Sequence, residues 1–190
     1  MKTSRREFVK VGGLAVAGFA FLPDSERFSA FARATIEMRS DANGSRVWFD
    51  PIGLFVEPGT TVRWIVRENV HTTTAYHPRN DHHSLRIPER ARSWDSGVLV
   101  NPGDHFEVTL TVPGVYDYFC APHESAGMVG RIVVGNSGGP GSEPFDYWVG
   151  KKGTSDWRHV PAQARNAFPS VSRIIAAHRI HASGSGKKDD

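Results

Sequence analysis

Residues 118–134 read YFCAPHESAGMVGRIVV and contain the only cysteine of the 190-residue chain. The residues VYDYFC have the composition of a strand that ends at Cys120, and MVGRIVV has that of a return strand. Between the two, Pro122 stiffens a short loop and Gly127 allows the chain to turn. We therefore expect a β-hairpin whose tight loop follows directly on the only thiol.

Other strands are expected upstream of this hairpin. Residues 45–51 and 54–68 are rich in Val, Ile, Trp and Phe, and apolar and polar residues alternate within residues 105–112. Pro-Gly pairs separate these runs as turns, at residues 58–59, 102–103 and 113–114. Several short strands separated by turns favour an all-β domain, either a sandwich or a barrel.

Two segments differ from this pattern. Residues 76–94 are polar and contain four arginines, so we interpret them as a long polar surface loop inserted into the domain. Residues 136–190 form a C-terminal extension, with the composition of a linker in GNSGGPGSEP near its start. Helical character begins near Ala162, and Pro169 predicts two short helices rather than one. The predicted organisation is a β domain at residues 35–135, followed by an extension that is partly helical.

Residues 1–34 have the features of an export signal. A basic pair at residues 5–6 precedes the apolar run at residues 11–22, which is shorter than the about 20 residues that span a bilayer. Small residues at Ala32 and Ala34 provide a cleavage site. The segment SRREFVK resembles a twin-arginine signal, which predicts export to the periplasm or the outer face of the cytoplasmic membrane. An uncleaved amphipathic anchor is the alternative interpretation.

Removal of the signal leaves a nearly neutral chain. The signal holds six of the 23 basic residues and three of the 20 acidic residues, so 17 of each remain. The net charge of +3 therefore comes from the predicted export signal. Such a balance provides no basic surface of the kind that binds nucleic acid, and we exclude nucleic acid as a partner.

The hairpin loop combines three side chains that bind soft metal ions. Cys120, His123 and Met128 offer a thiolate, an imidazole and a thioether. Sulfur ligands select Cu(I), imidazole suits both copper states, and two histidines with one cysteine and a weak methionine form the blue-copper set. A second imidazole must come from elsewhere, and His71 is the candidate because it follows the strand-forming run TTVRWIV. The alternative for Cys120 is a small buried side chain with a purely structural role.

The segment YFCAPHESAGMVGRIVV, with His71 far upstream, resembles the copper site of plastocyanins and halocyanin-type proteins. The order of ligands and the spacing Cys-x2-His-x4-Met match theirs. The resemblance covers roughly residues 45–135 and implies a cupredoxin fold, a Greek-key β-sandwich that binds one type 1 copper ion. By position, it implies His71, Cys120 and His123 as the strong ligands and Met128 as the axial ligand.

The sequence departs from this family at the residue after the first histidine. The family commonly carries asparagine there, and its side chain braces the ligand loop. This chain has Thr72 instead, whose shorter hydroxyl is expected to brace less well. The insert at residues 76–94 and the extension after residue 136 have no counterpart in the small members of the family.

The resemblance implies an electron carrier that cycles between Cu(I) and Cu(II), and not an enzyme. Electrons are expected to pass through the exposed edge of His123, with Pro122, Ala126 and Gly127 as small or apolar contacts around it. The expected partners are transient redox proteins, including an electron-transfer complex at the membrane, because redox encounters use small interfaces. The sequence leaves the identity of the partners, the reduction potential and the oligomeric state open.

Two other functions stay open from the sequence alone. A copper-handling protein would deliver or store the metal without shuttling electrons. A small copper oxidase or nitrite reductase would need a second copper site between subunits, and His77, His82 and His83 in HPRNDHH are the candidates for a weak second site. A solvated polar loop is the alternative interpretation of these three histidines.

Overall fold

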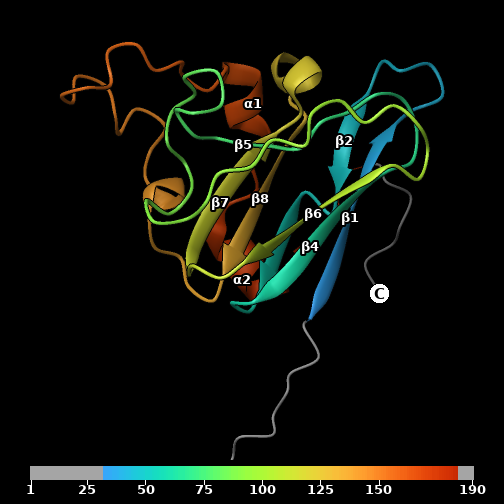
Figure 1. The fold of residues 1–190 in the computed structure, drawn as a ribbon, viewed down its shortest axis with the longest axis horizontal. Helices are drawn as coiled ribbons and strands as arrows, with labels where there is room; N and C mark the ends of the chain where they lie inside the picture. Colours follow the sequence, from blue (N-terminus) through green and yellow to red (C-terminus); the bar gives the residue numbers. More distant parts are fainter. Residues whose placement is uncertain (1–31, 184–190) are drawn as a thin grey trace, which may run out of the picture.

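Two β-sheets pack face to face in the computed structural model, which describes residues 32–183 (Figure 1). One sheet has the strand order β2-β1-β4-β6, and the other has the order β5-β7-β8-β3-β9. The strands of the first sheet are β1 (Arg33–Ser40), β2 (Val47–Asp50), β4 (Thr60–Val66) and β6 (His105–Leu110). The strands of the second are β3 (Gly53–Val56), β5 (Thr74–Ala75), β7 (Gly114–Phe119), β8 (Val129–Val134) and β9 (Arg179–Ile180). The structure is therefore the predicted β-sandwich, and not a barrel.

Alternation along β4 places its apolar side chains in the space between the sheets. Val62, Trp64 and Val66 are fully buried, and the residues between them are only partly buried. The Trp64 ring lies 5.3 Å from the ring of Tyr118 on β7, measured between centroids, so the two sheets meet through aromatic side chains. Period-two alternation in TVRWIV therefore predicted both the strand and the face that it buries.

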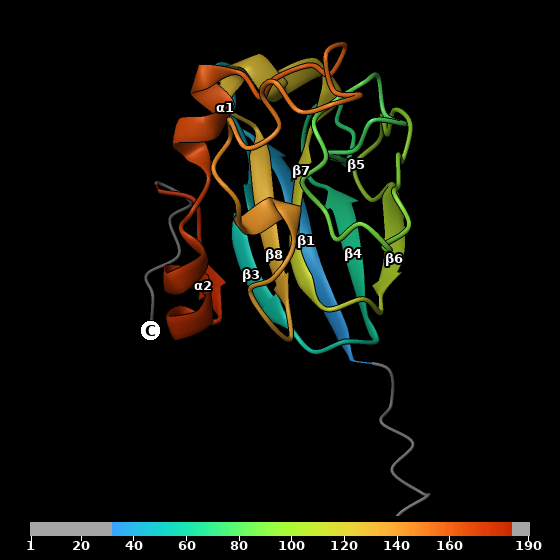
Figure 2. The same ribbon diagram turned by 90° about the vertical axis from the view of Figure 1, so that its left-hand side faces the viewer.

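Strands β7 and β8 are buried at every position, because each is covered on both faces. The inner face contacts the aromatic core. The outer face is covered by the C-terminal extension, in which α1 (Ala162–Ala167) and α2 (Val171–Ala177) lie beside the second sheet (Figure 2). Ile174 of α2 packs against Val115 and Val133 on that outer face.

The two short helices predicted around Pro169 are confirmed. Helix α1 ends at Ala167, and α2 begins after Ser170, whose Oγ accepts a hydrogen bond from the backbone N–H of Arg173 at 3.3 Å. The segment GNSGGPGSEP is not a free linker, however. It contains the short 3₁₀ helix η3 (Pro140–Ser142), and Pro140 and Gly141 are buried against β7.

The interpretation of residues 76–94 as a polar surface loop is wrong for much of the segment. Tyr76 and Ile87 are fully buried, Trp94 belongs to the main core, and Arg86 is only 1% exposed. Burial of Arg86 is possible because its Nε donates to Asp117 Oδ2 at 2.7 Å. The polar composition of the segment therefore does not indicate solvent exposure, since its most buried charge is paired inside the protein.

Asp117 on β7 joins three parts of the chain. Besides Arg86 of the insert, it accepts hydrogen bonds from Arg131 of β8, at 2.7 Å from Nε to Oδ1 and 2.9 Å from Nη2 to Oδ2. The two arginines also donate to carbonyl groups of the extension, Arg86 to Gly141 at 2.7 Å and Arg131 to Pro169 at 3.0 Å. This buried charge cluster fixes the extension to the sheet.

The predicted export signal lies almost entirely outside the described residues, since residues 1–31 are not described. Strand β1 begins at Arg33, and the carbonyl of Ala32 accepts a hydrogen bond from the Thr61 N–H at 2.9 Å. A mature chain that started at Thr35 would lack the first part of this strand. Between residues 32 and 183, no helix is both long and apolar enough to cross a membrane.

Candidate metal centre

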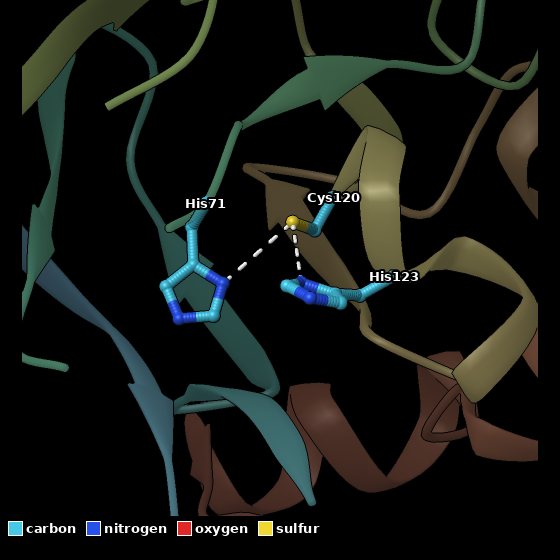
Figure 3. Close-up of side chains that lie close together, drawn as sticks. All are labelled: His71, Cys120 and His123. Carbon is cyan, nitrogen blue, oxygen red and sulfur yellow. Dashed lines mark hydrogen bonds between the residues drawn. The ribbon is translucent and has the colours of Figure 1, made fainter. Parts of the chain in front are cut away.

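Three metal-binding side chains converge at one end of the sandwich (Figure 3). The Nδ1 atom of His71 lies 3.7 Å from Cys120 Sγ, and the Nδ1 atom of His123 lies 3.4 Å from the same sulfur. The donor atoms of the three residues all lie within 4.8 Å of one another. In the described part of the chain this is the only group of three or more His, Cys, Asp or Glu side chains placed to hold a metal ion.

The ligand loop supplies two of these side chains and is held by its own backbone. Cys120 follows β7, and residues 121–126 form the 3₁₀ helix η2 (Ala121–Ala126). The N–H of Cys120 donates to the carbonyl of Met128 at 3.0 Å, and the N–H of Met128 donates to the carbonyl of His123 at 3.1 Å. Gly127 ends the turn with a φ of 86°, a left-handed conformation that favours glycine. The hairpin predicted from the sequence therefore has the predicted loop.

His71 reaches the site from the connection between β4 and β5. It lies beyond the end of β4 and forms a backbone bridge with Leu99, with N–H to carbonyl distances of 3.1 and 2.9 Å. Met128, which directly precedes β8, is 1% exposed and lies in the same apolar cluster as Cys120. The four residues named from the sequence, His71, Cys120, His123 and Met128, are thus brought to one end of the molecule.

Burial favours the uncharged forms of the ligand side chains, which are the neutral imidazoles and the protonated thiol. Burial lowers the pKa of His71 to about 4, with a further contribution from the nearby charge of His123, and it also lowers the pKa of His123. Both imidazoles are therefore neutral at pH 7. Burial raises the pKa of the Cys120 thiol to about 11, so a metal ion that binds the thiolate displaces its proton.

The chemistry of these donors fits a copper ion. A buried thiol faces two neutral imidazoles that both turn Nδ1 toward it, with a buried thioether in the same cluster. Two imidazoles, a thiolate and a thioether are the donor set of a type 1 copper site. His71, Cys120, His123 and Met128 are therefore the residues that would hold one copper ion.

Thr72 connects the two ligand-bearing segments. Its hydroxyl oxygen accepts a hydrogen bond from the N–H of Ala121 at 2.7 Å, and its own N–H donates to Cys120 Sγ at 3.3 Å. The hydroxyl also lies 3.2 Å from that of Thr74. The shorter side chain at this position therefore still reaches across to the ligand loop.

The residues expected around His123 differ in their exposure. Pro122 and Ala126 are exposed and His123 is half-buried. Gly127 is partly covered by α1, because a Cβ atom built on it would lie 3.5 Å from Gln163. The surface beside the ligand loop is therefore narrower than the sequence implied, since the extension occupies one side of it.

The three histidines of HPRNDHH do not meet. His82 Nδ1 lies 3.1 Å from Asp156 Oδ2 on the surface, and His77 Nδ1 accepts a hydrogen bond from the N–H of Arg79 at 3.1 Å. His83 is buried and contacts Glu124. This separation gives no support to a second metal site built from the three.

Sequence reasoning missed Glu124, which follows His123 directly and is 7% exposed. The Tyr76 hydroxyl donates to its Oε1 at 2.7 Å, and His83 Nε2 lies 3.2 Å from its Oε2. Burial alone would lower the pKa of His83, but the hydrogen bonds to Glu124 and to the Asn80 carbonyl raise it overall. The one signal in the sequence that could have indicated these contacts was the presence of a carboxylate inside a metal-binding loop.

Comparison with known proteins places these features in a family. The sequence model of the family described as copper binding proteins, plastocyanin/azurin family, matches residues 35–135. A chloroplastic plastocyanin of Chlamydomonas reinhardtii is 30% identical over 138 residues, which cover 70% of this chain and 86% of the plastocyanin.

Two solved structures of other proteins have a similar fold. A pseudoazurin of Sinorhizobium meliloti superposes with a TM-score of 0.51 and 27% identity, covering 72% of this chain and 90% of the pseudoazurin. A pseudoazurin of Methylobacterium extorquens superposes with a TM-score of 0.50 at 19% identity, covering 77% of this chain and 96% of that one. The second likeness concerns the fold alone.

Proposed function

This chain belongs to the plastocyanin/azurin family of copper-binding proteins, and from that membership we propose that it is a single-copper electron carrier. The observation that carries the proposal is the convergence of His71, Cys120 and His123, with Met128 buried beside them. A bound copper ion would supply one-electron chemistry by alternating between Cu(I) and Cu(II). The protein would supply the fixed ligands and the route to the surface.

Fixed ligands are what a rapid electron carrier needs, because little rearrangement then accompanies a change of charge. His71 is fixed by its bridge to Leu99, and the ligand loop is fixed by the hydrogen bonds from Cys120 to Met128 and from Met128 to His123. Thr72 joins the two segments. All of these contacts lie within the chain, so the protein scaffold itself holds the ligands in place.

His123 is the ligand that connects the site to the surface. His71 and Cys120 are fully buried and Met128 nearly so, whereas His123 is only half-buried. Exposed Pro122 and Ala126 surround it with small or apolar side chains. A redox protein that docks on this face would make the small, transient contact that is typical of electron-transfer encounters.

We place the protein outside the cytoplasmic membrane, in the periplasm or on its outer face. The support is the twin-arginine pattern and short apolar run within residues 1–34. Its redox partners would then be soluble carriers or an electron-transfer complex of the membrane. The near-neutral mature chain gives no support to a nucleic-acid partner.

Copper loading tests this function directly. The purified protein is titrated with Cu(II), and its visible spectrum, copper content and response to a reductant are recorded. We expect one copper per chain and an intense blue or green band that bleaches and returns reversibly. Cys120→Ser should remove the band, whereas His105→Gln, which removes an exposed imidazole on β6, should leave it unchanged.

Other outcomes would identify the competing functions. A colourless protein that binds only Cu(I) would indicate copper delivery or storage and overturn the carrier. Binding of more than one copper per chain, together with turnover of oxygen or nitrite, would indicate a copper oxidase or nitrite reductase instead.

A further inference from the structure

We propose that Tyr76, Glu124 and His83, here called the Glu124 cluster, position the ligand loop and thereby set the orientation of His123 for electron transfer. The inference rests on the proposed function for its biological meaning, but its geometry consists of contacts within the chain itself. Glu124 acts in it as a positioning residue, because it would act through the loop that carries His123.

The first step is the unusual burial of Glu124. It lies in η2, where Ala121, Pro122, Ser125 and Ala126 are all exposed, yet Glu124 itself is 7% exposed. Burying a carboxylate costs free energy unless hydrogen bonds replace its contacts with water. The loop therefore has a specific inward anchor, directly adjacent to the ligand His123.

The second step is that both carboxylate oxygens have buried partners. The hydroxyl of Tyr76 donates to Oε1 at 2.7 Å, and His83 Nε2 lies 3.2 Å from Oε2. The Nδ1 atom of His83 lies 2.7 Å from the carbonyl of Asn80, which can only accept, so Nδ1 carries a proton. With Nδ1 protonated, the other ring nitrogen of His83 faces Oε2 of Glu124, and this contact joins residue 83 of the insert to the ligand loop.

The third step is that these partners are themselves fixed to the sheet. The N–H of Tyr76 donates to the carbonyl of Asp117 on β7 at 3.1 Å, and its carbonyl accepts from the N–H of Arg86 at 3.0 Å. The rings of Tyr76 and His83 lie 4.6 and 4.3 Å from the ring of Phe119, measured between centroids. Phe119 immediately precedes Cys120, so the cluster holds His123 in place relative to the residue that carries the sulfur.

The fourth step concerns the points at which the ligand loop is fixed. Thr72 fixes the start of the loop through the N–H of Ala121, and the Glu124 cluster fixes its middle. The N–H groups of Gly127 and Met128 donate to the carbonyls of Glu124 and His123, at 2.9 and 3.1 Å. Displacement of Glu124 would therefore move the carbonyls that organise the rest of the loop, and the His123 side chain with them.

The test uses Tyr76→Phe, which removes one hydroxyl from the cluster, and Glu124→Ala, which removes the anchor. The matched control is Tyr116→Phe, because the Tyr116 hydroxyl is also partly buried and donates to the carbonyl of Val112 at 2.6 Å. Glu124→Gln serves as the conservative rescue, because its amide oxygen can still accept from Tyr76.

Two readouts separate positioning from simple stability. In the metal-free protein, we expect amide hydrogen exchange at Gly127 and Met128 to become about tenfold faster in Tyr76→Phe and Glu124→Ala, but not in Tyr116→Phe. In the copper-loaded protein, we expect a changed ratio of the two visible absorption bands and an electron self-exchange rate about tenfold lower. Glu124→Gln should restore most of both properties.

The positioning role would be overturned if Tyr76→Phe and Glu124→Ala lowered the unfolding temperature as Tyr116→Phe does while the loop amides and the band ratio stayed at wild-type values. Failure of the proposed function would be recognised separately, because the exchange measurement needs neither copper nor a redox partner. Tyr76→Phe removes a single oxygen atom, so it keeps the test decisive if Glu124→Ala does not fold.

Discussion

Thr72 shows how much a single hydroxyl group can organise at this site. Its oxygen accepts from the N–H of Ala121 in the ligand loop, while its backbone N–H donates to the sulfur of Cys120. The first contact fixes the loop, and the second places a donor against the atom whose hydrogen bonding helps to set the reduction potential of blue-copper sites. Side chain and backbone of one residue thus serve two different purposes.

Replacing Thr72 by valine keeps the shape of the side chain and removes only the oxygen. The N–H of Ala121 then loses its acceptor, so we expect the free energy of unfolding of the metal-free protein to fall by about 1–3 kcal/mol. Denaturant unfolding of Thr72→Val and Thr72→Ser measures the effect. The serine variant keeps the oxygen and should stay close to wild type, and equal losses in both variants would contradict this role of the hydroxyl.

At the scale of residues, the sequence predicted the ligands better than their supports. Cys120, His123 and Met128 are recognisable because they share one short loop with a fixed spacing. His71 could be named because the family resemblance gives its place at a strand end. The carboxylate of Glu124 is visible in the loop sequence, but its burial could not be predicted, since that depends on Tyr76 and His83 and the sequence does not show that the insert folds back onto the loop.

Strand β7 is the element on which the rest of the domain depends. Cys120 follows its end, its outer face is covered by the extension, and Asp117 in its middle binds Arg86 and Arg131. The side chain of Asp117 is fully buried, and those of the two arginines are 2% and 8% exposed. Removal of one member of such a buried cluster leaves charges without partners.

Asp117→Asn should therefore lower the free energy of unfolding by about 3–5 kcal/mol, because two buried guanidinium groups lose their counter-ion. The matched control is Glu37→Gln, which weakens the partly exposed pair between Glu37 and Arg67, 2.9 Å apart, and a longer contact of Glu37 with Arg39 at 3.5 Å. That pair should contribute no more than about 1 kcal/mol. Denaturant unfolding compares the two, and similar small losses for both would show that the buried cluster does not stabilise the fold.

At the scale of elements, alternation and turn residues predicted the strands and helices that depend on local sequence. The period of two in β4 and the break at Pro169 between the helices are both local signals, and both predictions are confirmed. The interpretation of residues 76–94 was wrong because it counted arginines as solvated. Arg86 can be buried because it pairs with the carboxylate of Asp117, which is 31 residues away in the sequence. No local sequence pattern reveals that pairing.

The whole molecule is a sandwich whose second sheet is covered by its own C-terminal extension. Carbonyl groups of Gly141 and Pro169 accept hydrogen bonds from the buried arginines, and Ile174 covers apolar residues of β7 and β8. Helix α1 contacts the ligand loop as well. The extension is therefore part of the folded domain, although the family model matches only residues 35–135.

A chain that ends at Gly135 tests this integration. This shorter chain lacks the side chains that cover β7 and β8 and the carbonyl groups that accept hydrogen bonds from two buried arginines. We therefore expect its free energy of unfolding to be lower by about 3 kcal/mol or more. The control is a chain that ends at Ser183, which keeps every described contact and should unfold like the full-length protein. An unchanged thermal midpoint in the shorter chain would contradict the structural role of the extension.

The central claim is that four side chains from two separate segments of the domain bind one copper ion. Its most direct test is a crystal structure of the copper-loaded protein, with the metal located by its anomalous scattering. We predict one copper peak per chain, bonded to Nδ1 of His71, Nδ1 of His123 and Sγ of Cys120, with the Met128 sulfur as a weaker fourth ligand. A copper peak elsewhere, or a Cys120 sulfur that does not contact the metal, would contradict the claim.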